Sequence, residues 1–231
     1  MTQTGLSEKP HFYGHRDRLR ERFAASNGDD LPDYELLELL LFQIIPRRDV
    51  KPLAKQMIAR FGSFAETLAA PIEQLQDFAG MGETSALAIK AIYAAARRMG
   101  KQQILNKTIL NHQQGVLDYC RAAMAYEAKE QFRILFLNNK NILIADEVQQ
   151  VGTVNHTPVY PREVIKRALE LSATAIILVH NHPSGDPTPS RDDIEMTKKL
   201  REAGRALNVA IHDHIIMAKN GHTSFADAGL L

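Results

Sequence analysis

Two histidines stand two residues apart at the end of an apolar run. His180 and His182 follow residues 175–179, a short aliphatic run bounded by His, Asn, Pro and Gly, which predicts a buried strand. Because alternate side chains of a strand point to the same face, both imidazoles lie on one side and Asn181 points to the other. Two imidazole nitrogens placed in this way can converge on one cation at ~2.0–2.1 Å.

The start of the next predicted helix supplies a carboxylate. Ser190 is a natural N-cap, and Ser190 and Asp193 have the spacing of a capping box. The Pro- and Gly-rich loop 183–189 can bring Asp193 beside the histidines. Two imidazoles and one carboxylate leave a fourth tetrahedral position for water, which is typical of a catalytic zinc site. Zinc lowers the pKa of such a water to ~7 and thereby provides hydroxide at neutral pH.

Each part of this constellation also has a simpler explanation. A His-x-His pair in a strand is most often two polar residues at the strand end, and Ser190 with Asp193 could serve only as a helix cap. The combination favours a metal site, because a capped helix needs no pair of histidines on the preceding strand. The single cysteine, Cys120, excludes an intramolecular disulfide and a cysteine-based zinc cage.

These residues resemble a known family. His180, His182, Ser190 and Asp193 stand at the spacings of the His-x-His-x7-Ser-x2-Asp signature of the JAMM (MPN-type) zinc metalloproteases and isopeptidases. The fuller segment 180–190, together with 161–164 and 213–216, resembles the RadC-like (UPF0758) branch of that family, and the resemblance covers essentially the whole chain.

The resemblance implies both a fold and an activity. It implies an α/β MPN (JAB/cytidine-deaminase-like) domain, with a mixed curved sheet flanked by helices, and one zinc per chain held by His180, His182 and Asp193. Ser190 would steady the oxyanion or the water. The implied reaction is hydrolysis of a peptide or isopeptide bond by zinc-activated water. Asn181 departs from the residue common in the isopeptidases, which disfavours a ubiquitin-type substrate.

The resemblance also implies a glutamate that acts as general base from an earlier strand. Glu130, just before the predicted strand 132–137, fits that position best, with Glu147 and Glu163 as alternatives. Each of them could instead be a solvated charge, and Glu163 could complement its helix dipole. The second His-x-His, at residues 212–214, has no third ligand nearby in sequence. A structural role, or a role in supporting a metal ligand, is expected there, with Asp213 as a candidate to orient a ligating imidazole.

The 231 residues allow one large domain or two small ones, and the patterning favours two. Residues 1–102 read as a small all-α module, 103–112 as a linker, and 113–231 as an α/β domain in which strands and helices alternate. The elements expected in the first part are helices at 34–45, 50–61, 71–78 and 84–99. Those expected in the second are strands at 132–137, 142–144, 175–179 and 209–217 and helices at 161–171 and 189–207.

The helical module carries a second, weaker motif. Residues 75–89 resemble a helix-hairpin-helix, in which Gly80 and Gly82 would let backbone N–H groups approach a DNA phosphate. The basic segment 14–22 could add phosphate contacts. Alternatively, the turn only packs two helices and the segment is a solvated helix face. The net charge of +1, from 28 basic and 27 acidic residues, gives no global basic field.

Composition excludes several classes of protein. With 45% hydrophobic and 24% charged residues the chain has the balance of a soluble globular protein, which excludes a disordered tail, a collagenous repeat and a coiled-coil rod. The most apolar run, 36–45, is far shorter than the ~20 residues a bilayer requires, and no secretory signal is apparent, so a cytoplasmic protein is expected. The expected function is a zinc metallohydrolase. The alternatives are a DNA repair or recombination accessory protein and a zinc-dependent nuclease.

Overall fold

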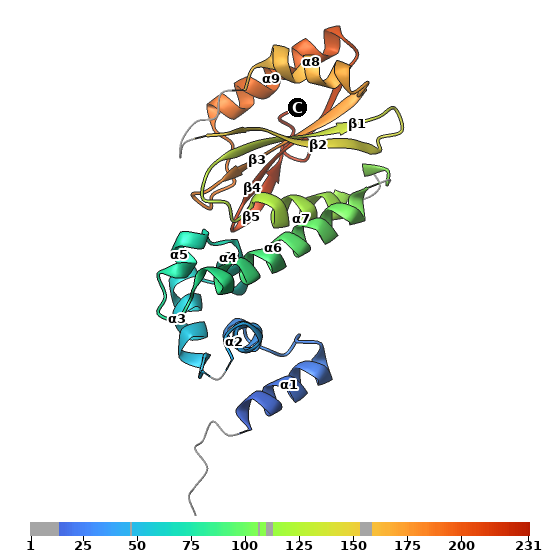
Figure 1. The fold of residues 1–231 in the computed structure, drawn as a ribbon. Helices are drawn as coiled ribbons and strands as arrows, with labels where there is room; N and C mark the ends of the chain where they lie inside the picture. Colours follow the sequence, from blue (N-terminus) through green and yellow to red (C-terminus); the bar gives the residue numbers. More distant parts are fainter. Residues whose placement is uncertain (1–13, 47, 106, 110–112, 153–158) are drawn as a thin grey trace, which may run out of the picture. The chain divides into compact units, whose positions relative to one another are not determined.

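The computed structural model describes residues 14–46, 48–105, 107–109, 113–152 and 159–231 (Figure 1). The chain divides into two compact units, Met1–Ile92 and Tyr93–Leu231. Residues 106 and 110–112 of the predicted linker lie outside the described residues. No helix in the described part of the chain combines the length and apolar character needed to cross a membrane.

The described part of the first unit is helical, which confirms the predicted all-α module. The four predicted helices are found with small shifts at their ends. Two further helices, His15–Ser26 and Phe64–Ala69, were not among them; the second of these is capped by the Ser63 hydroxyl, which accepts a hydrogen bond from the Glu66 N–H. The last helix is longer than predicted and continues into the second unit. The elements are α1 (His15–Ser26), α2 (Asp33–Ile44), α3 (Lys51–Phe61), α4 (Phe64–Ala69), α5 (Ile72–Gln76) and α6 (Glu83–Ile104).

The second unit is built on a five-stranded mixed sheet with the strand order β2-β1-β3-β4-β5. Strand β3 pairs in antiparallel fashion with β1 and in parallel with β4. Helices α8 and α9 cover one face of the sheet and α7 covers the other (Figure 1). This confirms the predicted mixed α/β fold. The elements are α7 (Gln113–Met124), β1 (Gln131–Leu137), β2 (Leu143–Val151), α8 (Pro161–Glu170), β3 (Ala175–His182), α9 (Arg191–Ala206), β4 (Ala210–Ala218) and β5 (Gly221–Ser224).

The period-two alternation of β3 sorts its side chains between two hydrophobic cores. Ile176 and Leu178 pack on the α8/α9 face, whereas Ile177 and Val179 pack on the α7 face. A strand buried on both faces reads as a continuous apolar run, which is why its position could be predicted. The same alternation carries the next even-numbered residues, His180 and His182, to the α8/α9 face.

Three strands differ from the sequence prediction. Strand β2 is much longer than 142–144, because it is an edge strand whose polar residues 146, 147, 149 and 150 hide the usual pattern of a strand. Strand β3 continues to His182, since pairing with β4 extends through the histidines. Strand β5 was not predicted; it is only four residues long and depends on pairing with the end of β4.

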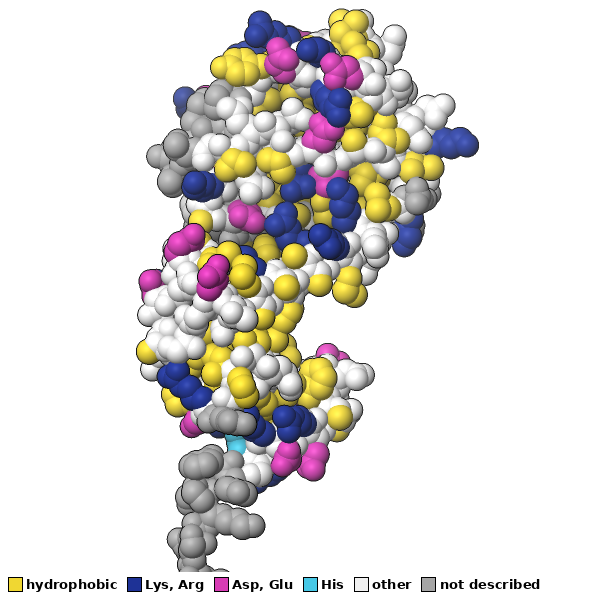
Figure 2. All heavy atoms as spheres, in the orientation of Figure 1, with side chains coloured by type: hydrophobic (Ala, Val, Ile, Leu, Met, Phe, Trp, Pro, Cys, Tyr) yellow, Lys and Arg dark blue, Asp and Glu magenta, His cyan; other side chains and the backbone are white. Residues whose placement is uncertain are grey.

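Charged side chains of both signs are interspersed over much of the face shown in Figure 2, in keeping with the small net charge. One group of Lys and Arg side chains stands out on the second unit, on the side where α6 and α7 lie.

Candidate metal centre

The end of β3 and the start of α9 form one cluster of ligating side chains. The loop 183–189 turns the chain back so that α9 begins beside His180 and His182. Ser190 caps α9: its hydroxyl accepts from the Asp193 N–H, and the Asp193 carboxylate accepts from the Ser190 N–H, which confirms the predicted capping box. A purely local signal therefore places the Asp193 carboxylate in the first turn of α9.

The ligating atoms of the cluster are close together. The two Nε2 atoms of His180 and His182 are 3.0 Å apart, and Asp193 Oδ1 lies 3.2 Å from His180 Nε2. Asp193 Oδ2 is 3.7 Å from His182 Nε2. One nitrogen from each histidine and one carboxylate oxygen all lie within 4.8 Å of one another. The sequence prediction named the same three residues as zinc ligands.

A chain of hydrogen bonds determines which nitrogen of His180 carries its proton. The Thr197 hydroxyl donates to the Asp193 carbonyl oxygen at 2.6 Å, so it can only accept from His214 Nδ1, also at 2.6 Å. His214 is buried and neutral, and its Nε2 must therefore accept from His180 Nδ1, 2.8 Å away. The lone pair of neutral His180 consequently lies on Nε2, facing the cluster.

The same argument applies to His182. Its Nδ1–H donates to the Asp186 carbonyl oxygen at 2.8 Å, so the lone pair of the neutral ring also lies on Nε2. The two Nε2 lone pairs and the Asp193 carboxylate thus face one small space. The two lone pairs and the carboxylate repel one another unless a proton or a cation lies between them. Two imidazoles and a carboxylate form a donor set that fits zinc.

The pKa shifts favour a proton on His182 rather than on His180. Burial lowers the pKa of His180 to about 4, so this ring is neutral at pH 7. The hydrogen bond to Asp193 raises the pKa of His182. Burial acts to raise the pKa of Asp193, but the hydrogen bonds from His182 and Ser190 hold it well below its ordinary value. A metal must displace the His182 proton, so metal affinity should fall as the pH drops below the raised pKa of His182.

The Ser190 side chain lies against the carboxylate ligand. Its hydroxyl donates to Asp193 Oδ2 at 2.6 Å, in addition to accepting from the helix backbone. Asp193 Oδ2 is therefore held by the helix cap, while Oδ1 is directed at His180. In this arrangement Ser190 orients the ligand.

The antiparallel register of β1 and β3, continued by two residues, places Glu130 opposite His182. Phe132 pairs with His180 across β1 and β3, and Glu130, two residues earlier in the chain, approaches His182, whose pKa its charge helps to raise. The Asn181 side chain fixes this approach from the opposite face of β3. Its Oδ1 accepts from the Gln131 N–H at 2.8 Å, and its Nδ2 donates to the backbone carbonyls of Glu127 and Lys129.

The other two candidate bases have different partners. Glu147, on β2, accepts from Arg167 Nη2 at 2.6 Å and from Arg167 Nε at 2.9 Å, and these hydrogen bonds lower its pKa. Glu163 is exposed at the start of α8 and pairs with Arg162. Of the three glutamates, the structure brings Glu130 to the histidine cluster.

Sequence reasoning expected a structural or ligand-supporting role for the second His-x-His without singling out His214, and it missed Thr197. It offered Asp213 as a candidate to orient a ligating imidazole, but the Asp213 carboxylate accepts from the backbone N–H groups of His214 and Ala226 and from the Ser224 hydroxyl. The contact to His180 comes from His214 instead. The second His-x-His was the available signal, and only the parallel pairing of β3 with β4 shows which of its residues matters.

Replacing His214 by phenylalanine should weaken zinc binding about 10- to 100-fold, because a second partner that orients a ligating histidine contributes this much. The ring would still pack against Phe132 and Phe225, but His180 Nδ1–H would lose its acceptor. Competition with a chromophoric chelator measures the affinity. The matched control is His212→Phe on the same strand, where His212 bonds Asn141 and not the cluster. Equal affinities of the two variants would contradict the positioning role.

Comparison with protein families gives two matches. The RadC-like JAB domain family matches residues 110–230, which contain the whole histidine and aspartate cluster. The UPF0758 N-terminal family matches residues 13–87, within the helical part of the chain. The first match alone spans more than half of the chain.

Proposed function

Because the chain belongs to the RadC-like JAB domain family, we propose that it is a zinc-dependent metallohydrolase that cleaves peptide or isopeptide bonds. His180, His182 and Asp193 would hold one zinc per chain. The observation that carries the proposal is the convergence of two imidazole lone pairs and a carboxylate on one space beside Glu130.

The residues around this space have complementary roles in hydrolysis. Zinc, when bound, supplies a water acidic enough to act as a nucleophile at neutral pH. The Glu130 carboxylate would accept the proton of that water as its oxygen attacks the substrate carbonyl carbon. When the C–N bond breaks, Glu130 would return the proton to the departing amine. Ser190 and His214 would keep Asp193 and His180 in position throughout.

The presence of a single cluster of candidate metal ligands in the described residues favours carbonyl chemistry. In the part of the chain that the structure describes, His180, His182 and Asp193 form the only group of three or more candidate ligands. Phosphodiester cleavage more often uses two cations ~3.5–4 Å apart. A single centre with an adjacent carboxylate therefore supports a protease over the alternative of a zinc-dependent nuclease.

The experiment is a comparison of substrates with the zinc-loaded full chain. A peptide pool and a DNA duplex are incubated separately with the protein, before and after chelation of the metal and after zinc is restored. We expect peptide cleavage, detected by mass spectrometry, that is lost on chelation and recovered with zinc. Cleavage of DNA alone would instead support the nuclease, and no cleavage of either would count against hydrolase activity.

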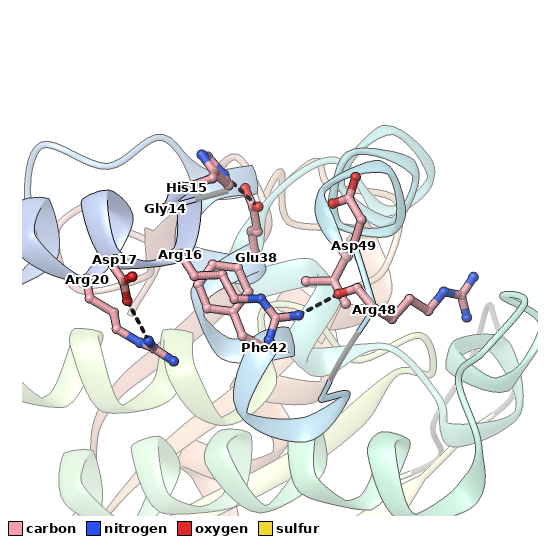
Figure 3. Close-up of a pocket in the computed structure, with 10 residues that line it drawn as sticks. Gly14, His15, Arg16, Asp17, Arg20, Glu38, Phe42, Arg48 and Asp49 are labelled. Atoms are coloured by element: carbon pink, nitrogen blue, oxygen red, sulfur yellow. Dashed lines mark hydrogen bonds and ion pairs between the residues drawn. The ribbon is translucent and has the colours of Figure 1, made fainter. Parts of the chain in front are cut away.

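A DNA-binding accessory role is a second candidate, supported by the turn before α6. The Arg48 guanidinium lies beside Gly80, in the space that a Cβ there would need, and Gly82 has open space on its Cα. Arg16 donates to the Arg48 carbonyl oxygen at 2.5 Å, and Figure 3 shows the Arg48 side chain extending away from Arg16. A guanidinium beside the N-terminus of a helix suits a phosphate.

If this turn binds DNA, Gly82→Asp should weaken binding without loss of stability. Gly82 is at the N-cap of α6, since its carbonyl accepts from the Ala86 N–H, and Asp is a good N-cap residue. Its carboxylate would nevertheless repel a phosphate. Arg48→Gln should reduce the slope of log affinity against log salt by about one. Fluorescence anisotropy with labelled DNA tests both, with Gly82→Ala as control; unchanged binding in both variants would exclude this site.

A further inference from the structure

A second feature lies on the opposite face of the sheet from the metal centre. Along β1, Phe132 and Ile134 face α8 and α9, so Arg133 faces α7. There a cavity of about 290 Å³ is lined mainly by cations. Its charged and polar lining consists of Arg97, Arg98 and Lys101 from α6, Tyr119 from α7, Arg133 from β1 and Asp146 from β2.

The single carboxylate of the lining is fully engaged. Asp146 Oδ1 accepts from Arg133 Nη1 at 2.5 Å, and Oδ2 accepts from Lys101 Nζ at 3.0 Å and from the Tyr119 hydroxyl. The Asp146 side chain is 1% exposed, so no further donor reaches it from solvent. Asp146 therefore pairs directly with two cations, Arg133 and Lys101. No carboxylate of the lining is left to neutralise Arg97 and Arg98.

Arg133 has a buried donor without a hydrogen-bond partner among the residues that the structure describes. The residue is 5% exposed, and its Nε has no hydrogen-bond partner. A buried N–H without an acceptor carries the full cost of its desolvation, and this cost is higher for a charged group. Arg133 also lines the cavity, so its guanidinium adds a positive charge to the lining.

The α6 side of the cavity adds more positive charge. Arg97 and Lys101 are four residues apart and Arg98 and Lys101 three apart, so the three side chains are neighbours on the helix and repel one another. Arg97 Nη1 lies 3.7 Å from Glu127 Oε1, outside the cavity lining. Among the residues that the structure describes, Arg98 has no carboxylate partner within ion-pair distance. Figure 2 shows Lys and Arg side chains gathered on this side of the second unit.

We propose that this cavity binds a phosphate group, presented either by a small molecule of nucleotide size or by nucleic acid. Planar guanidinium groups and an ammonium group match phosphate oxygens in geometry and charge. The volume lies near the lower end of small-molecule sites, which span ~300–1,000 Å³, so one phosphate with a small attached group fits. The ligand oxygens would accept from Arg97, Arg98 and Lys101, the lining cations that reach solvent, and would bring these three side chains together.

Isothermal titration calorimetry of the full chain tests the proposal with inorganic phosphate, pyrophosphate, adenosine 5′-monophosphate and a short oligonucleotide. We expect one site per chain for at least one of these probes. The double variant Arg97→Gln/Arg98→Gln should weaken binding by about tenfold or more, because hydrogen bonds to charged groups are lost. Both residues reach solvent, so the variant should fold, which circular dichroism checks.

Arg201→Gln, an exposed arginine on α9, is the matched control and should bind like the wild type. Binding of the mononucleotide would identify a small molecule as the source of the phosphate. Binding of the oligonucleotide alone, with a salt dependence that the double variant reduces, would identify nucleic acid. The proposal is overturned if no probe binds at millimolar concentration, or if the double variant binds as tightly as the control.

Discussion

Glu130→Gln should reduce the rate of peptide hydrolysis about 10²- to 10⁴-fold, the usual contribution of a general base. Glutamine keeps the size and one acceptor oxygen of the side chain but cannot take up a proton at neutral pH. Glu130 is not among the proposed metal ligands, so zinc should remain at one per chain. The measurements are kcat on a cleaved peptide and the zinc content of the same sample.

Two matched variants separate the candidate bases. Glu147→Gln would weaken the ion pair with Arg167, and Glu163→Gln would weaken the exposed pair with Arg162; both should leave kcat nearly unchanged. If Glu147→Gln were inactive and Glu130→Gln active, the base would be Glu147. In that case the position of Glu130 beside His182 would have no catalytic meaning.

His182→Ala and His180→Ala should each abolish stoichiometric zinc binding and, with it, hydrolysis. Three side chains supply the whole donor set, so the loss of one imidazole leaves two ligands and a widened space. The wild-type melting temperature should rise with added zinc, because a ligand that binds only the native state stabilises it, whereas that of each variant should not. Elemental analysis after dialysis and a thermal melt measure the two effects.

The two variants distinguish the loss of a zinc ligand from a loss of folding. His180 is buried, so His180→Ala leaves a cavity, whereas His182 is partly exposed and its replacement should be tolerated. His222→Ala, on the exposed side of β5, is the control and should retain zinc. A His182→Ala protein that folds and still holds one zinc per chain would contradict the proposed ligand set.

The parts of the site that follow from local sequence could be predicted. The alternation of a strand places His180 and His182 on one face, and a capping box of four residues places Asp193 at the start of α9. Each signal needs only neighbouring residues. The same holds for the aliphatic run of β3, which reads as a buried strand without any knowledge of its partners.

The parts of the site that depend on strand pairing could not be predicted from neighbouring residues alone. His214 reaches His180 only because β3 and β4 pair in parallel, with Leu178 opposite His214. Glu130 approaches His182 through the antiparallel pairing of β1 with β3 and through the hydrogen bonds of Asn181. These contacts join residues 34 and 50 positions apart in the chain. No periodic pattern in the sequence indicates in which register such distant segments pair. Only the family resemblance favoured Glu130.

The most direct test of the account is a crystal of the zinc-loaded protein, with diffraction data collected on both sides of the zinc absorption edge. One anomalous peak per chain should lie between His180 Nε2, His182 Nε2 and Asp193 Oδ1, with each ligand at ~2.0–2.2 Å and a further position open to solvent. A zinc peak at another place in the chain, or these three side chains turned away from the metal, would contradict the account.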